Sequence, residues 1–298
     1  MEISSAFAGT RLKPFTTQVD ARQTMNYAAA VGDRNPCYFD DRRKAGLAAP
    51  PMLPAAITWN ITGRIWEYLE AEDFPVDALL TQVHHTETIV HHRPLVPGDR
   101  LTIDGVIAAI ESHRSGTRVI IRYAAVDNNG QPVFTEYCGA LLRGVTCVDG
   151  DRQISELPAI PAADAASRSI WQVTVDIDPL ASHIYDGCTD IVFPIHTSPK
   201  FADTVGLPGT IYQGTATLAH AVREIVDREA DRLPSSIRTI SGRFTGMVQP
   251  GSSIAIRLTE RRRTPAGQAL FFEVLTDDGQ KAISNGYAEI INGSCPED

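Results

Sequence analysis

Two pairs of residues in this sequence have the chemistry and the spacing of a catalytic site. Asp190 precedes His196 by six positions in the second half of the chain, and Asp33 precedes Tyr38 by five in the first half. A carboxylate and an imidazole that both lie about a hydrogen-bond length from one water could take its proton and return one to a reacting atom. Asp190 and His196 are therefore the catalytic candidates.

The first pair lacks a histidine. Asp33 and Asn35 stand in a short polar segment before Pro36. Asp and Asn side chains readily bond nearby backbone N–H groups, so these two residues are expected to stabilise a turn.

Other groups of polar residues favour no further site. His84 and His85, like His91 and His92, are sequence neighbours, and neighbours on a strand point to opposite faces, so neither pair can chelate a metal from one side. The five cysteines form no CxxC pair, and no metal site is expected. Arginines 261–263 could meet phosphates, but a solvated surface position is the favoured interpretation.

Composition limits the classes of partner. The chain has 298 residues and a formal net charge of -9, which argues against broad binding to nucleic acid or to an anionic membrane. No segment approaches the roughly 18 uninterrupted apolar residues of a spanning helix. The first thirty residues show no leader pattern, so a cytoplasmic location is expected.

The sequence contains a diverged internal repeat. Asp33 and Asp190 lie 157 positions apart, and the Pro-Gly pairs at 97–98 and 250–251 lie 153 apart. Between them each half has a Gly-Leu pair, at 46–47 and 206–207, and after them a turn rich in Asp and Gly, at 127–130 and 277–279. The shared order of these features indicates a duplicated fold.

Each copy is expected to hold one long helix followed by antiparallel strands. Apolar residues recur at helical spacing from Pro54 to Glu70 and from Ile211 to about Arg228. Alternating apolar runs follow each helix, which predicts an α+β fold with a sheet curved around the helix. The expected division is residues 1–148, a linker over 149–170, and residues 171–298.

The two copies of the Asp-containing segment resemble the MaoC-like, or hydratase 2, family. Residues 27–40 read YAAAVGDRNPCYFD, close to that family's Gly-Asp-x-Asn-Pro-x-His motif except that Tyr38 takes the histidine position. Residues 185–198 read YDGCTDIVFPIHTS and keep Asp190 and His196, with one extra residue between them. The segment GLPGTIYQG, residues 206–214, is similar to the family's Gly-rich approach to the central helix.

The resemblance implies two tandem hot-dog folds, with the first half housing the acyl chain and the second half carrying catalysis. It implies (R)-specific hydration of a 2-enoyl-CoA, or the reverse dehydration, with coenzyme A as part of the substrate and no separate cofactor. Gly214, at the expected helix start, is the candidate backbone N–H donor to the thioester oxygen. The expected substrate contacts come from neighbouring residues: Thr189, Phe193, Ile211, Tyr212 and Gln213. A homodimer is expected because sheet edges need covering.

Two other functions remain open on the sequence. Hot-dog proteins include thioesterases, which need only a carboxylate to activate water, and non-catalytic subunits that pair with another hot-dog protein. His196 favours hydration, because proton return gives an imidazole a task. Trp59, Trp66 and Tyr68 in the first helix suggest a short or ring-bearing acyl group.

Overall fold

The computed structural model describes residues 1–164 and 169–291. The helices are α1 (Ala21–Ala30), α2 (Leu53–Thr62), α3 (Ile65–Tyr68), α4 (Ala181–Thr189), α5 (Pro199–Thr204) and α6 (Gly214–Glu229). The strands are β1 (Glu2–Ser4), β2 (Arg11–Gln18), β3 (Gln82–His91), β4 (Arg100–His113), β5 (Gly116–Asp127), β6 (Pro132–Arg143), β7 (Thr146–Val148), β8 (Arg152–Gln153), β9 (Trp171–Asp176), β10 (Ile237–Phe244), β11 (Ser253–Thr264), β12 (Gly267–Thr276) and β13 (Lys281–Ile291).

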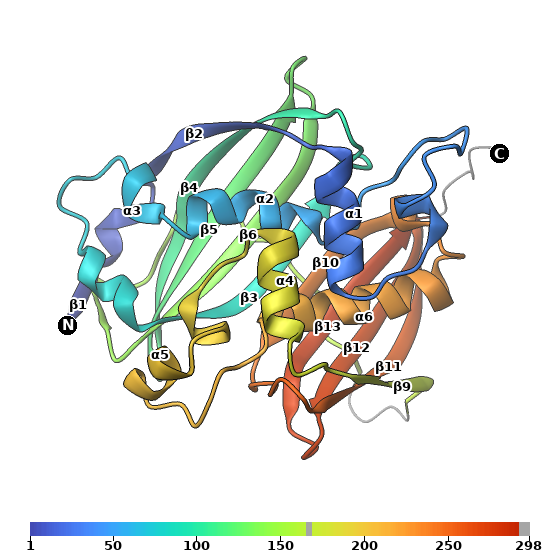
Figure 1. Ribbon diagram of the computed structural model, residues 1–298. Coiled ribbons are helices and arrows are strands. Elements are labelled where there is room, and N and C mark those ends of the chain that lie inside the picture. The colour runs from blue at the N-terminus through green and yellow to red at the C-terminus, as the bar shows by residue number, and fades with distance from the viewer. Residues whose placement is uncertain (165–168, 292–298) are drawn as a thin grey trace.

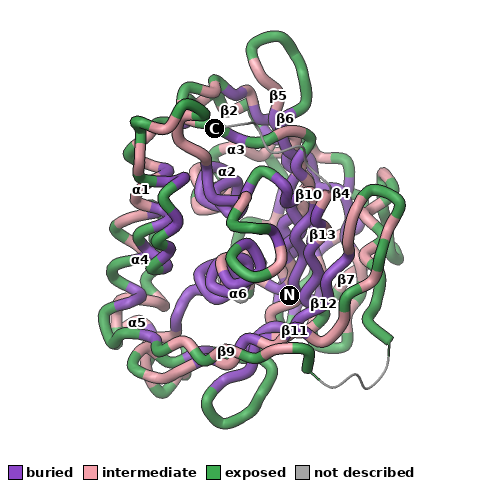
Figure 2. Tube along the Cα trace, turned by 90° about the vertical axis from the view of Figure 1, so that its right-hand side faces the viewer, coloured by how far each residue is buried: buried purple, intermediate pink, exposed green. Residues whose placement is uncertain are grey.

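One large sheet organises the described residues. Its strand order is β2-β4-β5-β6-β3-β10-β13-β12-β11-β9, with β8 paired to β4, and every pairing in it is antiparallel. The central helices α2 and α6 lie against this sheet, and α1, α4 and α5 form a further layer outside them (Figures 1 and 2). The predicted α+β double hot-dog architecture is therefore confirmed.

The two copies meet along equivalent strands. β3 pairs with β10, and the Thr88 Oγ1 lies 2.8 Å from the Ser241 Oγ across that pairing. These residues are 153 positions apart, the same offset as the two Pro-Gly pairs. Since equivalent residues face each other in antiparallel strands, the two halves are related by an approximate twofold axis at this point.

The tyrosines that lead the two copies of the Asp-containing segment also meet. The hydroxyl oxygens of Tyr27 in α1 and Tyr185 in α4 lie 3.0 Å apart, and both side chains are buried. Their rings pack edge to face with centroids 5.9 Å apart. This contact joins α1 to α4 at the centre of the outer helical layer.

The second central helix has the predicted apolar face, but it begins later than predicted. Leu218, Val222 and Ile225 of α6 are at most 2% exposed, as their spacing predicts. The predicted start at Ile211 is wrong, because the backbone N–H groups of Ile211 and Tyr212 donate to the carbonyls of Ile195 and Val248. The chain is therefore held in other bonds until the helix begins at Gly214.

The predicted continuous helix from Pro54 to Glu70 is also wrong. α2 ends at Thr62, and Arg64 leaves helical geometry with φ of -137° and ψ of 40° before α3 begins. Trp66 in α3 is 53% exposed, so it does not line the interior. The expectation of a short or ring-bearing acyl group was based on Trp59, Trp66 and Tyr68, and Trp66 no longer supports it.

The segment from 149 to 164 is tied to the first half and to the second. β8 pairs with β4, and the Asp151 carboxylate accepts a hydrogen bond from the Ser112 N–H at 2.7 Å. The Asp164 N–H donates to the Glu260 carboxylate at 2.7 Å. Residues 165–168 of the expected linker lie outside the described residues. Across residues 1–164 and 169–291, no helix is long and apolar enough to cross a membrane.

Candidate active site

Asp190 is placed by the end of α4. It follows the last residue of that helix in the left-handed conformation, with φ of 59° and ψ of 16°, which Asp tolerates better than most residues. Its side chain is exposed, and within residues 1–164 and 169–291 no hydrogen bond or ion pair engages the carboxylate. The carboxylate is therefore available to a ligand.

His196 is held in one tautomer by a backbone carbonyl. It ends a short 3-10 helix, Pro194–His196, and its Nδ1 lies 2.8 Å from the carbonyl oxygen of Ile211. A carbonyl only accepts, so Nδ1–H donates and Nε2 keeps a free lone pair. Burial lowers the pKa of His196 to about 4, so the imidazole is neutral at physiological pH.

Gly214 opens α6 and leaves its N–H without an acceptor among the described residues. Such N–H groups at a helix start carry partial positive charge. A Cβ on this residue would lie 3.0 Å from the Phe244 Cδ1, so any other residue here would have to push the Phe244 ring of β10 slightly aside.

Hydrogen bonds join the elements that carry these three residues. The Tyr185 hydroxyl in α4 bonds the Thr215 Oγ1 in α6 at 3.2 Å, and the Gln213 Nε2 donates to the carbonyl of Ser182 at 3.0 Å. The Ile211 carbonyl fixes His196 three residues before Gly214. These bonds hold the first turn and the middle of α4, together with the 3-10 turn that carries His196, beside the start of α6.

The five expected substrate contacts divide into two groups. Thr189, Tyr212 and Gln213 are buried, and each has its side chain in an internal hydrogen bond: Thr189 donates to the carbonyl of Tyr185, Tyr212 bonds the Nε2 of His220, and Gln213 bonds Ser182. The polar groups of these three side chains are thus engaged within the protein. Phe193 and Ile211 are half-buried. Contact with substrate stays a prediction for all five residues.

Tyr185 and Thr215 were not among the residues expected at the site. They connect α4 to the helix that begins at Gly214, and Tyr185 is fully buried. The sequence could have indicated Tyr185, because a tyrosine begins both copies of the Asp-containing segment. Its hydrogen-bond partner Thr215 follows Gly214 directly, and no sequence pattern marked it as a site residue.

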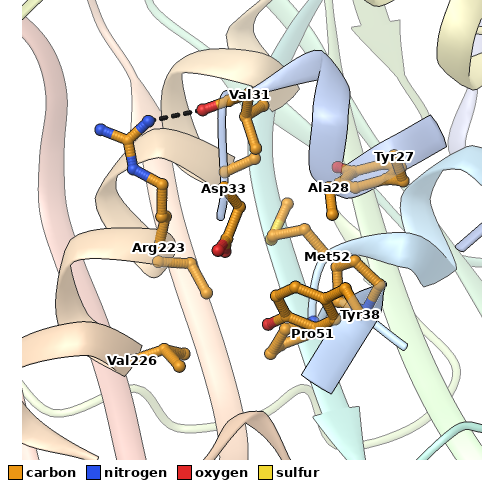
Figure 3. Close-up of a pocket in the computed structure, with 12 residues that line it drawn as sticks. Tyr27, Ala28, Val31, Asp33, Tyr38, Pro51, Met52, Arg223 and Val226 are labelled. Carbon is orange, nitrogen blue, oxygen red and sulfur yellow. Dashed lines mark hydrogen bonds between the residues drawn. The ribbon is translucent and has the colours of Figure 1, made fainter. Parts of the chain in front are cut away.

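In the first half, Asp33 and Tyr38 line a small pocket together with Arg223 of α6 (Figure 3). Asp33 accepts from the Asn35 N–H at 2.9 Å, and Asn35 accepts from the Cys37 N–H at 3.2 Å, which confirms the predicted turn. Tyr38 is 1% exposed. The space between Asp33, Tyr38 and Arg223 of α6 measures about 10 Å³, which is room for about one water.

The arginine run has structural partners. Arg261 makes two hydrogen bonds to the Glu229 carboxylate, at 2.6 and 2.7 Å, and Arg262 bonds Glu260 at 2.6 Å. The guanidinium of Arg262 also lies 4.6 Å from the centre of the Phe271 ring. These contacts agree with the surface position favoured for arginines 261–263.

The fold and the site define a class of protein, a duplicated hot-dog chain with an Asp/His pair in its second half. Residues 6–136 match the family model for the FAS1-like, dehydratase domain region, and residues 168–276 match that for the MaoC like domain. The chain belongs to the MaoC-like dehydratases of the double hot-dog type.

A relative from Dictyostelium discoideum, named "Probable enoyl-CoA hydratase 2", is 28% identical over 282 residues. The alignment covers 94% of this chain and 94% of the relative. The crystal structure of a MaoC-like dehydratase from Phytophthora capsici superposes with a TM-score of 0.81 at 18% identity, covering 96% of this chain and 97% of that one. A conserved hypothetical protein from Mycobacterium tuberculosis, described as having a double hotdog fold, gives a TM-score of 0.58 at 13% identity, covering 93% and 94%. These structures share the fold.

Proposed function

We propose that this chain catalyses the reversible addition of water to a 2-enoyl-CoA thioester, with Asp190 and His196 as the catalytic residues. It is thus a hydro-lyase acting on acyl-CoA. The observation that carries the assignment is the neutral His196, whose Nδ1 is bonded to the Ile211 carbonyl and whose Nε2 is free to take a proton. The relative named as an enoyl-CoA hydratase 2 supports the reaction class, because it aligns over nearly the whole chain.

In the proposed reaction His196 acts on the water and then on the substrate. The Nε2 takes one proton as the water oxygen bonds to C3, and the electron pair of the double bond moves toward the thioester oxygen. The same imidazole then returns its proton to C2. Asp190 accepts a hydrogen bond from the other hydrogen of the water and so orients it.

Gly214 fits the stabilisation of the thioester oxygen. Negative charge builds on that oxygen as water adds, and a preorganised N–H donor at a helix start stabilises such charge. The N–H of Gly214 lacks a protein acceptor among the described residues. Proton transfer and water addition require no electron carrier, so no separate cofactor is proposed.

Crotonyl-CoA provides the direct test. The purified chain is incubated with it while enoyl absorbance and free thiol are followed together, with Asp190→Asn and His196→Ala as variants. Loss of enoyl absorbance without thiol, abolished in both variants, is the expected result. Release of thiol would make the chain a thioesterase, and no reaction across a panel of enoyl chain lengths would make it a non-catalytic subunit.

We further propose a homodimer. β2 and β9 end the strand order of the large sheet, and such edges are commonly covered by another chain. Light scattering on the purified chain tests this, with a mass of one chain, 32.4 kDa, as the contrary result. The cytoplasmic location and the division into residues 1–148, 149–170 and 171–298 stay predictions.

A further inference from the structure

A second group of chemically reactive side chains lies in the first half, outside the Asp190 site. The His84 Nε2 on β3 is 3.1 Å from the Glu87 Oε2 on the same strand and 3.7 Å from the Cys138 Sγ on β6. One donor atom from each of the three residues lies within 4.8 Å of the others. Imidazole, carboxylate and thiolate are the usual ligands of Zn²⁺ in proteins.

A β-bulge makes this grouping possible. His84 and Glu87 are three positions apart, and on a regular strand they would point to opposite faces. Their partners on β6 are Ala140 and Cys138, so four residues of β3 oppose three of β6, and the register shift falls between His84 and Thr86. The extra residue turns His84 to the side of Glu87 and Cys138, an outcome that the pattern of paired histidines did not predict.

The spacing of the donor atoms fits a tetrahedral ion. Bonds of about 2.0–2.3 Å to nitrogen, oxygen and sulfur place the donors about 3.3–3.7 Å from one another. The separations of the His84 Nε2 from the Glu87 Oε2 and the Cys138 Sγ, 3.1 and 3.7 Å, already lie close to that range. Three protein ligands would leave one position of the tetrahedron open.

The two buried carboxyl groups beside the cluster, Glu87 and Glu136, have only some of the polar partners that they could use. Glu87 and Glu136 are 1% and 2% exposed, and the Glu87 Oε1 has no hydrogen-bond partner within residues 1–164 and 169–291. Thr58 of α2 bonds both carboxylate oxygens of Glu136 at 2.9 Å. A divalent cation would neutralise one thiolate and one carboxylate beside a neutral imidazole, which removes the cost of burying them uncompensated.

We propose that His84, Glu87 and Cys138 bind a divalent transition metal of the Zn²⁺ class. The side chain of His84 is 30% exposed and provides the route by which an ion enters. Its ring packs on that of Phe244 with centroids 4.6 Å apart, and Phe244 is the residue against which Gly214 packs. The metal site therefore lies one side chain away from the start of α6.

Cobalt serves as the spectroscopic probe. The full chain is freed of metal with a chelator and titrated with Co²⁺, with Cys138→Ser as the ligand variant and Cys147→Ser as the matched control. The expected result is one Co²⁺ per chain with thiolate-to-cobalt charge-transfer absorption, lost in Cys138→Ser and kept in Cys147→Ser. His84→Gln and Glu87→Gln should each weaken binding at least about tenfold.

X-ray absorption of the wild-type chain loaded with Zn²⁺ provides a measurement that does not depend on variants. One sulfur ligand with nitrogen and oxygen neighbours is expected. Absence of charge-transfer absorption in the wild type, its persistence in a folded Cys138→Ser, or a zinc shell without sulfur would overturn the proposal. These readouts are independent of hydratase activity, so either proposal can fail alone.

Discussion

The two copies of the Asp-containing segment show how one fold can keep a site in one half and close it in the other. In the first half, Asp33 and Asn35 are buried and satisfied by neighbouring N–H groups, and Tyr38 is buried beside a space of about 10 Å³. In the second half, Asp190 is exposed and its carboxylate has no hydrogen-bond partner in the part of the chain that the structure describes, and the tautomer of His196 leaves its Nε2 free to accept a proton. The local backbone engages the Asp33 carboxylate, and burial leaves little room beside it for a substrate.

The largest expected effect comes from a matched pair of aspartate variants. Asp190→Asn removes the charge that orients water and should lower kcat/KM for the best enoyl-CoA substrate by about 10²–10⁴-fold. Asp33→Asn keeps an oxygen that can accept from the Asn35 N–H and should leave kcat/KM within about twofold. Steady-state kinetics on both variants measures the contrast. Equal losses would show that the first half takes part in catalysis.

The pH dependence of the reaction should report the unusual state of His196. Burial holds its pKa at about 4, so the neutral form that acts as base persists well below the ordinary titration range of histidine. We expect kcat/KM to show no loss from this group between pH 7 and 5, and to fall about tenfold per unit below pH 4. A fall centred near pH 6.5 would contradict this environment for the imidazole.

Restoring a histidine in the first half should not create a second site. In the background of His196→Ala, the added change Tyr38→His would set an imidazole near Asp33, whose carboxylate already accepts from Asn35. The double variant is expected to remain inactive and to lose about 1–3 kcal/mol of unfolding free energy from lost packing. Kinetics and denaturant titration measure the two effects. If the double variant regained hydratase activity, the first half would be shown to form a working site as well.

The last prediction concerns the pH dependence of stability in the first half. Burial raises the pKa of Asp33 from 3.8 to about 6, so the unfolded chain releases this proton at lower pH than the folded chain. Stability due to Asp33 is therefore lost as pH rises from about 4 to 6, by at most about 3 kcal/mol. Asp33→Asn should remove that part of the pH dependence. Identical pH profiles for wild type and variant, from denaturant titration, would show that Asp33 ionises normally in the folded state.

The sequence by itself determined the duplication, the strand-rich halves with a central helix, and Asp190 and His196 as candidates. These follow from local order and periodicity: the Pro-Gly pairs, the hairpin turns, and the apolar stripe of Leu218, Val222 and Ile225 all depend on near neighbours in the chain. The capping role of Asp33 and Asn35 was predictable for the same reason, since each bonds an N–H two residues away.

Only the tertiary structure decided which groups remain free and which meet across the fold. The start of α6 at Gly214 depends on Tyr212 bonding Val248, and the tautomer of His196 depends on the Ile211 carbonyl. The grouping of His84 and Glu87 with Cys138 depends on a bulge against β6. Each of these involves a partner distant in sequence or a shift in strand register, and hydrophobic periodicity along one segment carries no information on either.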